Sequence, residues 1–392
     1  MTQIQQHKKI IFLTHVGNPG GAELCLLSLC AFLKEQGHFT CFQEGSLPAM
    51  VENMGISSSV LPMPHQIHAL RREDGIGRAL RMIPSICSFL KRLVTHIRPY
   101  DIVVCISQKS FVCAVLAKPF TRKPIIWFMN DLLTSDHFNP WMIRLMVHVF
   151  SRCADHIIVN SQASYDAWVI SGGRTHGIDI LYPGTKVEAI ITQVAHHQRA
   201  IAALKTQLSP DALPIIGMFG RISPWKGQDV FIRAIAALPN VRGIIVGGAQ
   251  FGESHYHDQL EGLIDELGVR SRITFLGHQE DVTTYMAACD VVAHCSTAPE
   301  PFGLVIVEAM CCGVPVVISD AGGAKEIIMP HPLMKSFPLG DVSELVKNLD
   351  ALLHMRVDHL SSYREAALMR ARQLFSIESM YDKFHAILKK IT

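Results

Sequence analysis

Residues 214–238 read PIIGMFGRISPWKGQDVFIRAIAAL, which is an apolar run, a glycine-bounded loop and an amphipathic segment in direct succession. The apolar run Pro214–Phe219 predicts a strand, and the segment near 227–238 predicts a helix. Repeated units of strand, turn and helix are typical of parallel sheets covered by helices. The stretch therefore predicts an α/β protein.

The same rhythm occurs in both halves of the chain. In the first half, strands are expected at Lys9–Leu13, Phe39–Phe42, Asp101–Cys105, Pro124–Phe128, His156–Val159 and Ile178–Leu181. In the second half, they are expected at Pro214–Phe219, Gly243–Val246, Ile273–Leu276, Val291–Ala293 and Val314–Ile318. Helices are expected near 21–36, 78–98, 138–153, 161–171, 227–238, 255–268, 281–288, 302–312 and 341–356. Residues 185–213 break this rhythm, so we expect one domain over residues 1–200 and a second over 201–375.

Length and composition exclude several classes of protein. The 392 residues exceed what one hydrophobic core usually spans, and a hydrophobic share of 49% excludes a disordered chain. The formal net charge of +2 is too close to zero for a protein that coats nucleic acid. Residues 1–184 carry a formal charge of +5 and the remainder −3, so the first half has the more basic surface.

The sequence carries no pattern typical of a leader or a membrane span. The first apolar run, Ile10–Leu13, is too short for a signal peptide, and Gly303–Ser319 is interrupted by Glu308 and too short for a span. The 11 cysteines include no CxxC spacing and lie mostly in apolar stretches. We therefore expect a reduced, cytoplasmic protein.

A glycine pair follows the first predicted strand. Gly20 and Gly21 precede the helix near 21–36, and adjacent glycines let the backbone approach an anion at a helix N-terminus. The loop matches neither GxGxxG nor a Walker A sequence. A tight connection without a ligand explains the pair equally well.

The loop after Pro214–Phe219 contains two cations, Arg221 and Lys226. A guanidinium binds paired phosphate oxygens and an ammonium adds a compact charge, so the two suit a diphosphate. Ligands of open parallel sheets bind at the carboxyl ends of strands. We therefore favour a diphosphate site over a solvated surface pair.

Residues 300–308 read EPFGLVIVE, with a carboxylate at each end. Pro301 and Phe302 are expected to open a helix, so the amides of Phe302, Gly303 and Leu304 can meet a phosphate. At a rise of about 1.5 Å per residue, the second carboxylate lies about 9 Å further along the helix axis. This separation suits a nucleotide whose diphosphate lies at the helix end.

In that arrangement Glu308 accepts the ribose hydroxyls, and Glu300 lies beside the group beyond the phosphate. A purely structural role would leave Glu308 as a buried charge without a partner, which is costly. The two carboxylates are therefore the strongest indication of a ligand site in the sequence.

Together these motifs resemble the retaining glycosyltransferases of family 4. The resemblance rests on Gly20-Gly21-Ala22-Glu23, on the loop from Gly220-Arg221 to Lys226-Gly227, and on Glu300 to Glu308 followed by Gly322-Gly323. It covers most of the chain and is strongest from Pro214 to Ile328. It implies the GT-B architecture, in which two Rossmann-like domains with parallel sheets face each other across a cleft and a C-terminal helix, here 376–392, packs back on the first domain.

The resemblance also implies a nucleotide-sugar donor on the C-terminal domain and an acceptor on the N-terminal domain. Glu308 would bind the ribose, Arg221 and Lys226 the diphosphate, Gly20 and Gly21 its other face, and Glu300 the transferred sugar. The two cations would stabilise the negative charge that grows on the leaving diphosphate, in place of a metal. No DxD sequence occurs, so we expect no metal and no cofactor.

One position departs from the family pattern. Many members carry a His-Asp pair after the fourth strand of the first domain, whereas this chain has Asn130-Asp131. Asn130 would contact the donor sugar without the charge of a histidine, which leaves altered substrate handling or an impaired activity open. Asp131 is a candidate acceptor ligand or base, with helix capping as the alternative. His15, after the first strand, is a further acceptor-site candidate.

We therefore expect a retaining, metal-independent glycosyltransferase that acts on a glycan or lipid-linked acceptor in cell-surface polysaccharide or glycolipid synthesis. The helix near 78–98 would contact an anionic membrane at its inner face, or would simply cover the sheet with a solvated basic side. Its cations are Arg78, Arg81, Lys91, Arg92 and Arg98. The alternatives are a non-catalytic partner subunit, motivated by Asn130, and a GT-B epimerase or phosphorylase.

Overall fold

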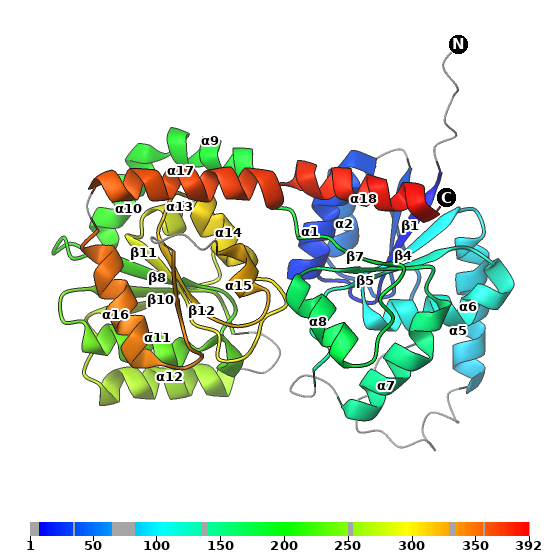
Figure 1. Cartoon of the computed structure of the whole chain (residues 1–392), viewed down its shortest axis with the longest axis horizontal. Coiled ribbons are helices and arrows are strands. Elements are labelled where there is room, and N and C mark those ends of the chain that lie inside the picture. Colours follow the sequence, from blue (N-terminus) through cyan, green and yellow to red (C-terminus); the bar gives the residue numbers. More distant parts are fainter. Residues whose placement is uncertain are drawn as a thin grey trace, which may run out of the picture. The chain divides into compact units, whose positions relative to one another are not determined.

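The computed structural model describes residues 8–33, 36–64, 83–134, 139–249, 254–328, 334–355 and 357–391 (Figure 1). The chain forms two compact units. The N-terminal unit comprises Met1–Gly184 and Met380–Thr392, and the C-terminal unit comprises Thr185–Ser379. The boundary expected after residue 200 falls inside helix α10 (Gln198–Leu208), which belongs to the C-terminal unit.

A parallel sheet of seven strands forms the centre of the N-terminal unit. Its order is β3-β2-β1-β4-β5-β6-β7, and all neighbouring strands are parallel. The strands are β1 (Ile10–Thr14), β2 (Gly37–Cys41), β3 (Ser57–Val60), β4 (Ile102–Cys105), β5 (Ile125–Met129), β6 (His156–Val159) and β7 (Ile178–Ile180). Strands β1, β4, β5 and β6 are buried along their whole length, which is why they appear as apolar runs in the sequence.

Helices cover both faces of this sheet (Figure 1). One face carries α5 (Ile83–Ile97), α6 (Gln108–Thr121), α7 (Pro140–His148) and α8 (Gln162–Ile170), whose buried residues share one core with Trp127 of the sheet. The other face carries α1 (Gly21–Cys30), α2 (Leu47–Asn53) and most of α18 (Ile377–Ile391), around a second core that includes Phe12 and Phe384. The short turns η1 (Ala31–Leu33) and η2 (Phe150–Cys153) complete the described elements of this unit.

The C-terminal unit contains a second parallel sheet, of order β10-β9-β8-β11-β12-β13. Its strands are β8 (Ile215–Phe219), β9 (Arg242–Val246), β10 (Ile273–Gly277), β11 (Val291–His294), β12 (Val316–Ser319) and β13 (Lys335–Phe337). On one face lie α11 (Gln228–Ala237), α12 (Ser254–Glu266) and α16 (Val342–Leu353). On the other lie α9 (Val187–His196), α10, α13 (Val282–Ala287), α14 (Leu304–Cys311) and α17 (Val357–Leu374). The short elements η3 (Pro224–Lys226) and α15 (Ala324–Ile327) lie in loops at the strand ends.

The two parallel sheets confirm the α/β class predicted from the sequence, and every predicted strand is present. The sequence did not reveal β3 and β13, because both are edge strands that are only partly buried and carry polar residues. It also missed α2, α6, α15, α17 and the pair α9 and α10 within residues 185–213. In α9, Val187, Ile190, Ile191 and Val194 stand at the spacing of one helix face, so an apolar stripe is present in the sequence, although only Val187 and Ile201 of the pair are fully buried.

The helix predicted near 78–98 is α5, and its first five residues, with Arg78 and Arg81, lie outside the described residues. In the part of the chain that the structure describes, no helix is both long and apolar enough to span a bilayer.

Candidate active site

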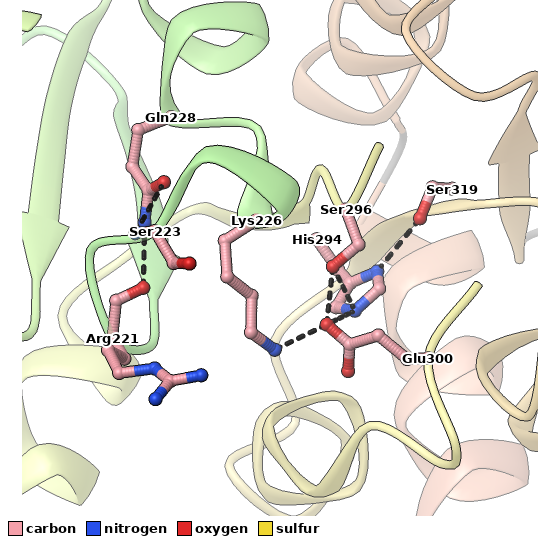
Figure 2. Close-up of polar contacts among 8 residues, drawn as sticks. All are labelled: Arg221, Ser223, Lys226, Gln228, His294, Ser296, Glu300 and Ser319. Atoms are coloured by element: carbon pink, nitrogen blue, oxygen red, sulfur yellow. Dashed lines mark hydrogen bonds and ion pairs between the residues drawn. The ribbon is translucent and has the colours of Figure 1, made fainter. Parts of the chain in front are cut away.

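The loop after β8, which carries both predicted cations, has a defined backbone. Gly220 has a φ of 137° and Gly247, after β9, a φ of 146°. A Cβ on Gly247 would lie 1.9 Å from the Gly220 carbonyl oxygen, so only glycine lets the two loops approach so closely. Gln228 braces the loop, because its Nε2 donates to the Arg221 carbonyl at 3.0 Å and its Oε1 accepts from the Ser223 amide at 3.4 Å (Figure 2).

The loop between β11 and α14 carries Glu300, which is 5% exposed. Glu300 pairs with Gly322 in an isolated parallel bridge, and the Gly323 amide donates to the Glu300 carbonyl at 2.8 Å. Gly322 has a φ of 63°, and a Cβ there would lie 2.3 Å from that carbonyl oxygen. The glycine pair after β12 therefore packs directly against the backbone of Glu300.

Three side chains meet at one oxygen of the Glu300 carboxylate (Figure 2). Oε1 accepts hydrogen bonds from Lys226 Nζ and Ser296 Oγ, and it lies 3.1 Å from His294 Nε2. The other ring nitrogen of His294, Nδ1, lies 3.2 Å from Ser319 Oγ. Residues from the ends of β8, β11 and β12 thus form one buried polar cluster, which we call the Glu300 cluster.

The surroundings of Glu300 favour its charged form. Burial alone would raise the pKa of Glu300, but the neighbouring His294 and Lys226, and hydrogen bonds from both, hold it well below its usual range. Glu300 is therefore an anion at neutral pH. All three contacts fall on Oε1, and within the described residues no hydrogen bond reaches Oε2. That oxygen retains its lone pairs for a ligand.

Glu308 lies in α14 and lines a pocket of about 190 Å³. Arg221 lines the same pocket, together with the glycine loop after β9 and residues 278–279 after β10. Burial raises the pKa of Glu308. Across the described ranges, no hydrogen bond or ion pair joins its carboxylate to another residue. The pocket thus presents a half-buried carboxylate with unused acceptor capacity.

Helix α14 begins at Leu304, not at Pro301 and Phe302 as predicted. Gly303 takes the N-cap position with a φ of 112°, which keeps the preceding residues out of the helix. Phe302 is 4% exposed and packs on Phe375, with ring centroids 5.5 Å apart. Among the described residues, no side chain caps the start of α14.

The glycine pair of the N-terminal unit lies at the start of α1, as predicted. The Gly20 amide donates to Glu23 Oε2 at 3.1 Å, and Thr14 Oγ1 donates to Glu23 Oε1 at 3.1 Å. The chain's own carboxylate therefore already binds one amide of this helix start. Gly21 has open space around its Cα, with no atom within 4 Å of a Cβ built there.

Three predicted residues follow strands of the N-terminal sheet. Asn130, after β5, is half-buried, and its Nδ2 donates to the Ile106 carbonyl at 3.3 Å. Asp131 is exposed and accepts from Gln108 Nε2 at 3.2 Å. His15, after β1, is half-buried, and its amide donates to Ser107 Oγ at 3.2 Å. The N-cap of α7 is Asn139, so Asp131 does not cap that helix.

Sequence analysis missed three members of the Glu300 cluster: His294, Ser296 and Ser319. The signal for His294 was its position at the carboxyl end of the apolar run 291–293, where ligand-binding residues of parallel sheets occur. Ser319 ends the neighbouring strand in the same way. No group of three or more His, Cys, Asp or Glu side chains in the described residues could hold a metal ion.

Two family models match the chain. Glycosyltransferase Family 4 matches residues 19–188, and Glycosyl transferases group 1 matches residues 202–370. The crystal structure of Anabaena HepE in complex with UDP and glucose is 32% identical, with a TM-score of 0.84 over 98% of this chain and 100% of that chain. A glycosyltransferase from Rickettsia africae has a TM-score of 0.84 at 18% identity and covers 98% of this chain and 99% of its own. These likenesses confirm the GT-B fold.

The chain belongs to glycosyltransferase family 4. Among curated relatives, the D-inositol 3-phosphate glycosyltransferase of Mycobacterium sp. (strain KMS) is 34% identical over 203 residues, which is 51% of this chain and 45% of that protein. The enzyme of the same description from Mycobacterium marinum is 32% identical over 240 residues, 60% of this chain and 50% of that protein. The chain thus matches about half the length of these relatives.

Proposed function

We propose that this protein is a retaining glycosyltransferase that transfers glucose from UDP-glucose to a glycan or lipid-linked acceptor without a metal ion. The observation that carries the proposal is the pairing of two features in the C-terminal unit, the Glu308 pocket and the Glu300 cluster. The choice of donor is supported by HepE, which is similar over its whole length and has been crystallised with UDP-glucose.

The pocket of about 190 Å³ is the proposed site of the uridine. A ribose presents two adjacent hydroxyl donors, and a carboxylate with free lone pairs is their natural acceptor. Glu308 is half-buried and its carboxylate has no partner among the described residues, so the ribose hydroxyls would find an acceptor that no other group uses. The glycine loop after β9 allows a ligand to approach its backbone closely.

The proposed diphosphate site combines Arg221, Lys226 and the uncapped start of α14. A helix start of this kind binds phosphate through its free amides and its dipole. Negative charge grows on the diphosphate as the sugar leaves, and preorganised cations stabilise it more in the transition state than in the ground state. This is the reason for expecting that the reaction needs no metal.

Glu300 is the proposed ligand of the transferred sugar. Lys226 forms an ion pair with Glu300, and a diphosphate bound beside it would compete for the same ammonium. His294 and Ser296 then remain to hold Oε1, and Oε2 accepts a sugar hydroxyl. The cluster thereby fixes the orientation of the sugar while the cation serves the phosphate.

In the proposed reaction the bond between the anomeric carbon and the diphosphate oxygen breaks, and a bond from that carbon to the acceptor oxygen forms on the same face. The acceptor proton passes to the departing phosphate oxygen, and UDP leaves. We assign the acceptor to the N-terminal unit, with His15 and Asp131 as candidate ligands and Asn130 as a candidate neutral contact to the sugar. Gly20 and Gly21 are the residues of the N-terminal unit that we propose as contacts to the donor diphosphate.

The experiment is a measurement of nucleoside diphosphate release from UDP-, GDP-, ADP- and TDP-sugars, with EDTA present. We expect release from UDP-glucose that rises when a lipid extract or an oligosaccharide is added. Glu308→Ala and Lys226→Ala should abolish it, whereas Glu280→Ala, at an exposed position of the same unit, should not. Release that depends on an added metal would contradict the proposed use of Arg221 and Lys226.

Silence across the whole panel, together with UDP binding to the wild type, would instead support a non-catalytic partner subunit. In that case Asn130→His is the first variant to measure. Conversion of the free sugar nucleotide, or a requirement for phosphate, would favour an epimerase or a phosphorylase.

A further inference from the structure

The ammonium of Lys226 has a second partner besides Glu300. Its Nζ lies 4.3 Å from the ring centroid of Trp225, the preceding residue of η3. This distance lies within the range of a cation–π contact, in which a cation is attracted to the electron-rich face of an indole. Figure 2 shows the ion pair of the same ammonium with Glu300. Lys226 is therefore held by an aromatic face and by a carboxylate.

The backbone of Trp225 is joined to the loop after β11, which also carries the Glu300 cluster. The Thr297 amide donates to the Trp225 carbonyl at 2.8 Å. Gly227, which follows η3 with a φ of 76°, packs on the same loop so closely that a Cβ there would lie 2.0 Å from the Cys295 carbonyl oxygen. The indole is thus fixed to the same stretch of backbone that positions the Glu300 cluster.

The two partners of the ammonium differ in what they do to its charge. A carboxylate neutralises the cation, and a bound diphosphate would compete with it for the same N–H donors. An indole face carries no net charge, so it attracts the ammonium without neutralising it. Trp225 is half-buried and the Lys226 side chain is 21% exposed, so water screens the contact only in part. Partial desolvation of this kind strengthens a cation–π contact.

A lysine needs such support because its ammonium stands on a flexible four-carbon stem. Ordering a side chain of this kind at the moment of binding costs free energy, whereas a side chain that is already ordered avoids that cost. A cation placed in advance also stabilises a growing negative charge without reorganisation. An aromatic ring beside the ammonium meets both requirements.

We propose that Trp225 is a positioning residue, which holds the Lys226 ammonium in place for the donor diphosphate. The inference rests on the proposed function, because it takes Lys226 as a diphosphate ligand. Trp225 acts through Lys226 and has no assigned contact with the reacting atoms. As the diphosphate draws the ammonium from Glu300, the contact with the ring limits how far the ammonium moves.

The first test compares the binding of UDP and of uridine to the full chain by isothermal titration calorimetry. Trp225→Leu should weaken UDP binding about fivefold. It should leave uridine binding unchanged, because uridine carries no phosphate for Lys226 to bind. Trp225→Phe keeps an aromatic face and should lose about twofold at most. Trp141→Leu, at an exposed position of the N-terminal unit, is the matched control and should change neither affinity.

The second test asks whether Trp225 acts through Lys226. In a Lys226→Met background the ammonium is gone, so adding Trp225→Leu should change the Kd of UDP by less than about twofold. The same double-mutant cycle, measured by urea unfolding without any ligand, should show the two residues coupled by about fivefold in the unfolding equilibrium constant. This second cycle needs neither donor nor acceptor.

Three results would overturn the proposal. Equal losses of UDP and uridine binding in Trp225→Leu would show that the substitution deforms the whole loop. Equal losses in Trp225→Leu and Trp225→Phe would show that the aromatic face is not what matters. Additive effects of Trp225→Leu and Lys226→Met in the ligand-free cycle would show that the ring does not hold the ammonium. Failure of the wild type to bind UDP would refute the proposed function, and the ligand-free cycle would still decide whether Trp225 holds Lys226.

Discussion

Replacing Glu308 with glutamine is predicted to stabilise the donor-free protein while weakening UDP binding. Glu308 is half-buried in its pocket, its carboxylate has no partner among the described residues, and burial raises its pKa, so its charge costs free energy when no UDP is bound. Removal of an unsatisfied buried charged group is worth on the order of 1 kcal/mol. For a unit of this size, that corresponds to an increase of about 2–4 °C in the midpoint of unfolding.

When UDP is present at a saturating concentration, the wild type is predicted to be more stable than the Glu308→Gln variant. Hydrogen bonds from the ribose to a charged acceptor contribute about 1.5–3 kcal/mol, so the Glu308→Gln variant should bind UDP at least about tenfold more weakly. A ligand present at about 100 times its Kd adds about 2.7 kcal/mol of stability. Saturating UDP should therefore raise the unfolding midpoint of the wild type by more than it raises that of the variant. Differential scanning calorimetry with and without UDP measures both effects.

The effect of pH follows from the direction of the shift. Burial raises the pKa of Glu308 above its value in the unfolded chain, so the ionised group destabilises the fold at high pH. This destabilisation disappears as the pH falls through the folded-state pKa. The advantage of Glu308→Gln over the wild type should therefore shrink on acidification. Glu280→Gln, exposed in the same unit, serves as the control. A lower midpoint for Glu308→Gln without UDP, or an undiminished UDP shift, would refute the reasoning.

Three further predictions concern the Glu300 cluster. His294→Asn removes the contact to Glu300 Oε1 and keeps an amide near Ser319 Oγ, whereas His294→Gln places an amide nitrogen near the position of Nε2. UDP-release kinetics should show about a tenfold loss of kcat/KM for His294→Asn and a smaller loss for His294→Gln. Equal losses in the two variants would contradict a positioning role for His294. Gly322→Ala should destabilise the protein by about 1–3 kcal/mol in urea unfolding. The reason is that Gly322 has a φ of 63° and that a Cβ there would lie 2.3 Å from the Glu300 carbonyl oxygen. The control is Gly262→Ala, which should be neutral or stabilising because a Cβ at Gly262 meets nothing within 4 Å. His294 and Lys226 lower the folded-state pKa of Glu300 although burial acts to raise it. The charged Glu300 therefore contributes stability above the unfolded-state pKa of about 4.3, and this stability is lost as the pH falls below that value. Glu300→Gln should flatten this part of the curve of stability against pH, and an unchanged curve would speak against a charged Glu300.

Much of the fold could be predicted from the sequence because its central strands are buried on both faces. Strands such as β1 and β8 must be apolar along their whole length, and this leaves a readable run between turns. The edge strands β3 and β13 escaped because an edge needs no such run. Helices α9 and α10 were missed although the sequence carries a helical apolar pattern, at Val187, Ile190, Ile191 and Val194 in α9, because residues 185–213 were interpreted only as a break between domains.

The start of α14 illustrates the limit of local rules. Pro301 and Phe302 fit the first turn of a helix by composition, yet the helix begins at Leu304. The reason is tertiary, because the preceding backbone pairs with Gly322 and Gly323 after β12 and Phe302 is held against Phe375. Contacts between segments distant in sequence overrode the local preference.

Local sequence rules were enough to predict the α/β class and to single out the two cations after β8 and the two carboxylates of residues 300–308 as a candidate site. These are consequences of short-range rules, namely strand burial, loop position and the cost of a buried charge. The fold brings Lys226, His294 and Ser296 to one oxygen of Glu300 and places Glu308 in a pocket with Arg221, and the sequence did not predict either arrangement. Parallel strands that are far apart in the chain end at the same edge of a sheet, and no local pattern specifies which of their side chains meet there.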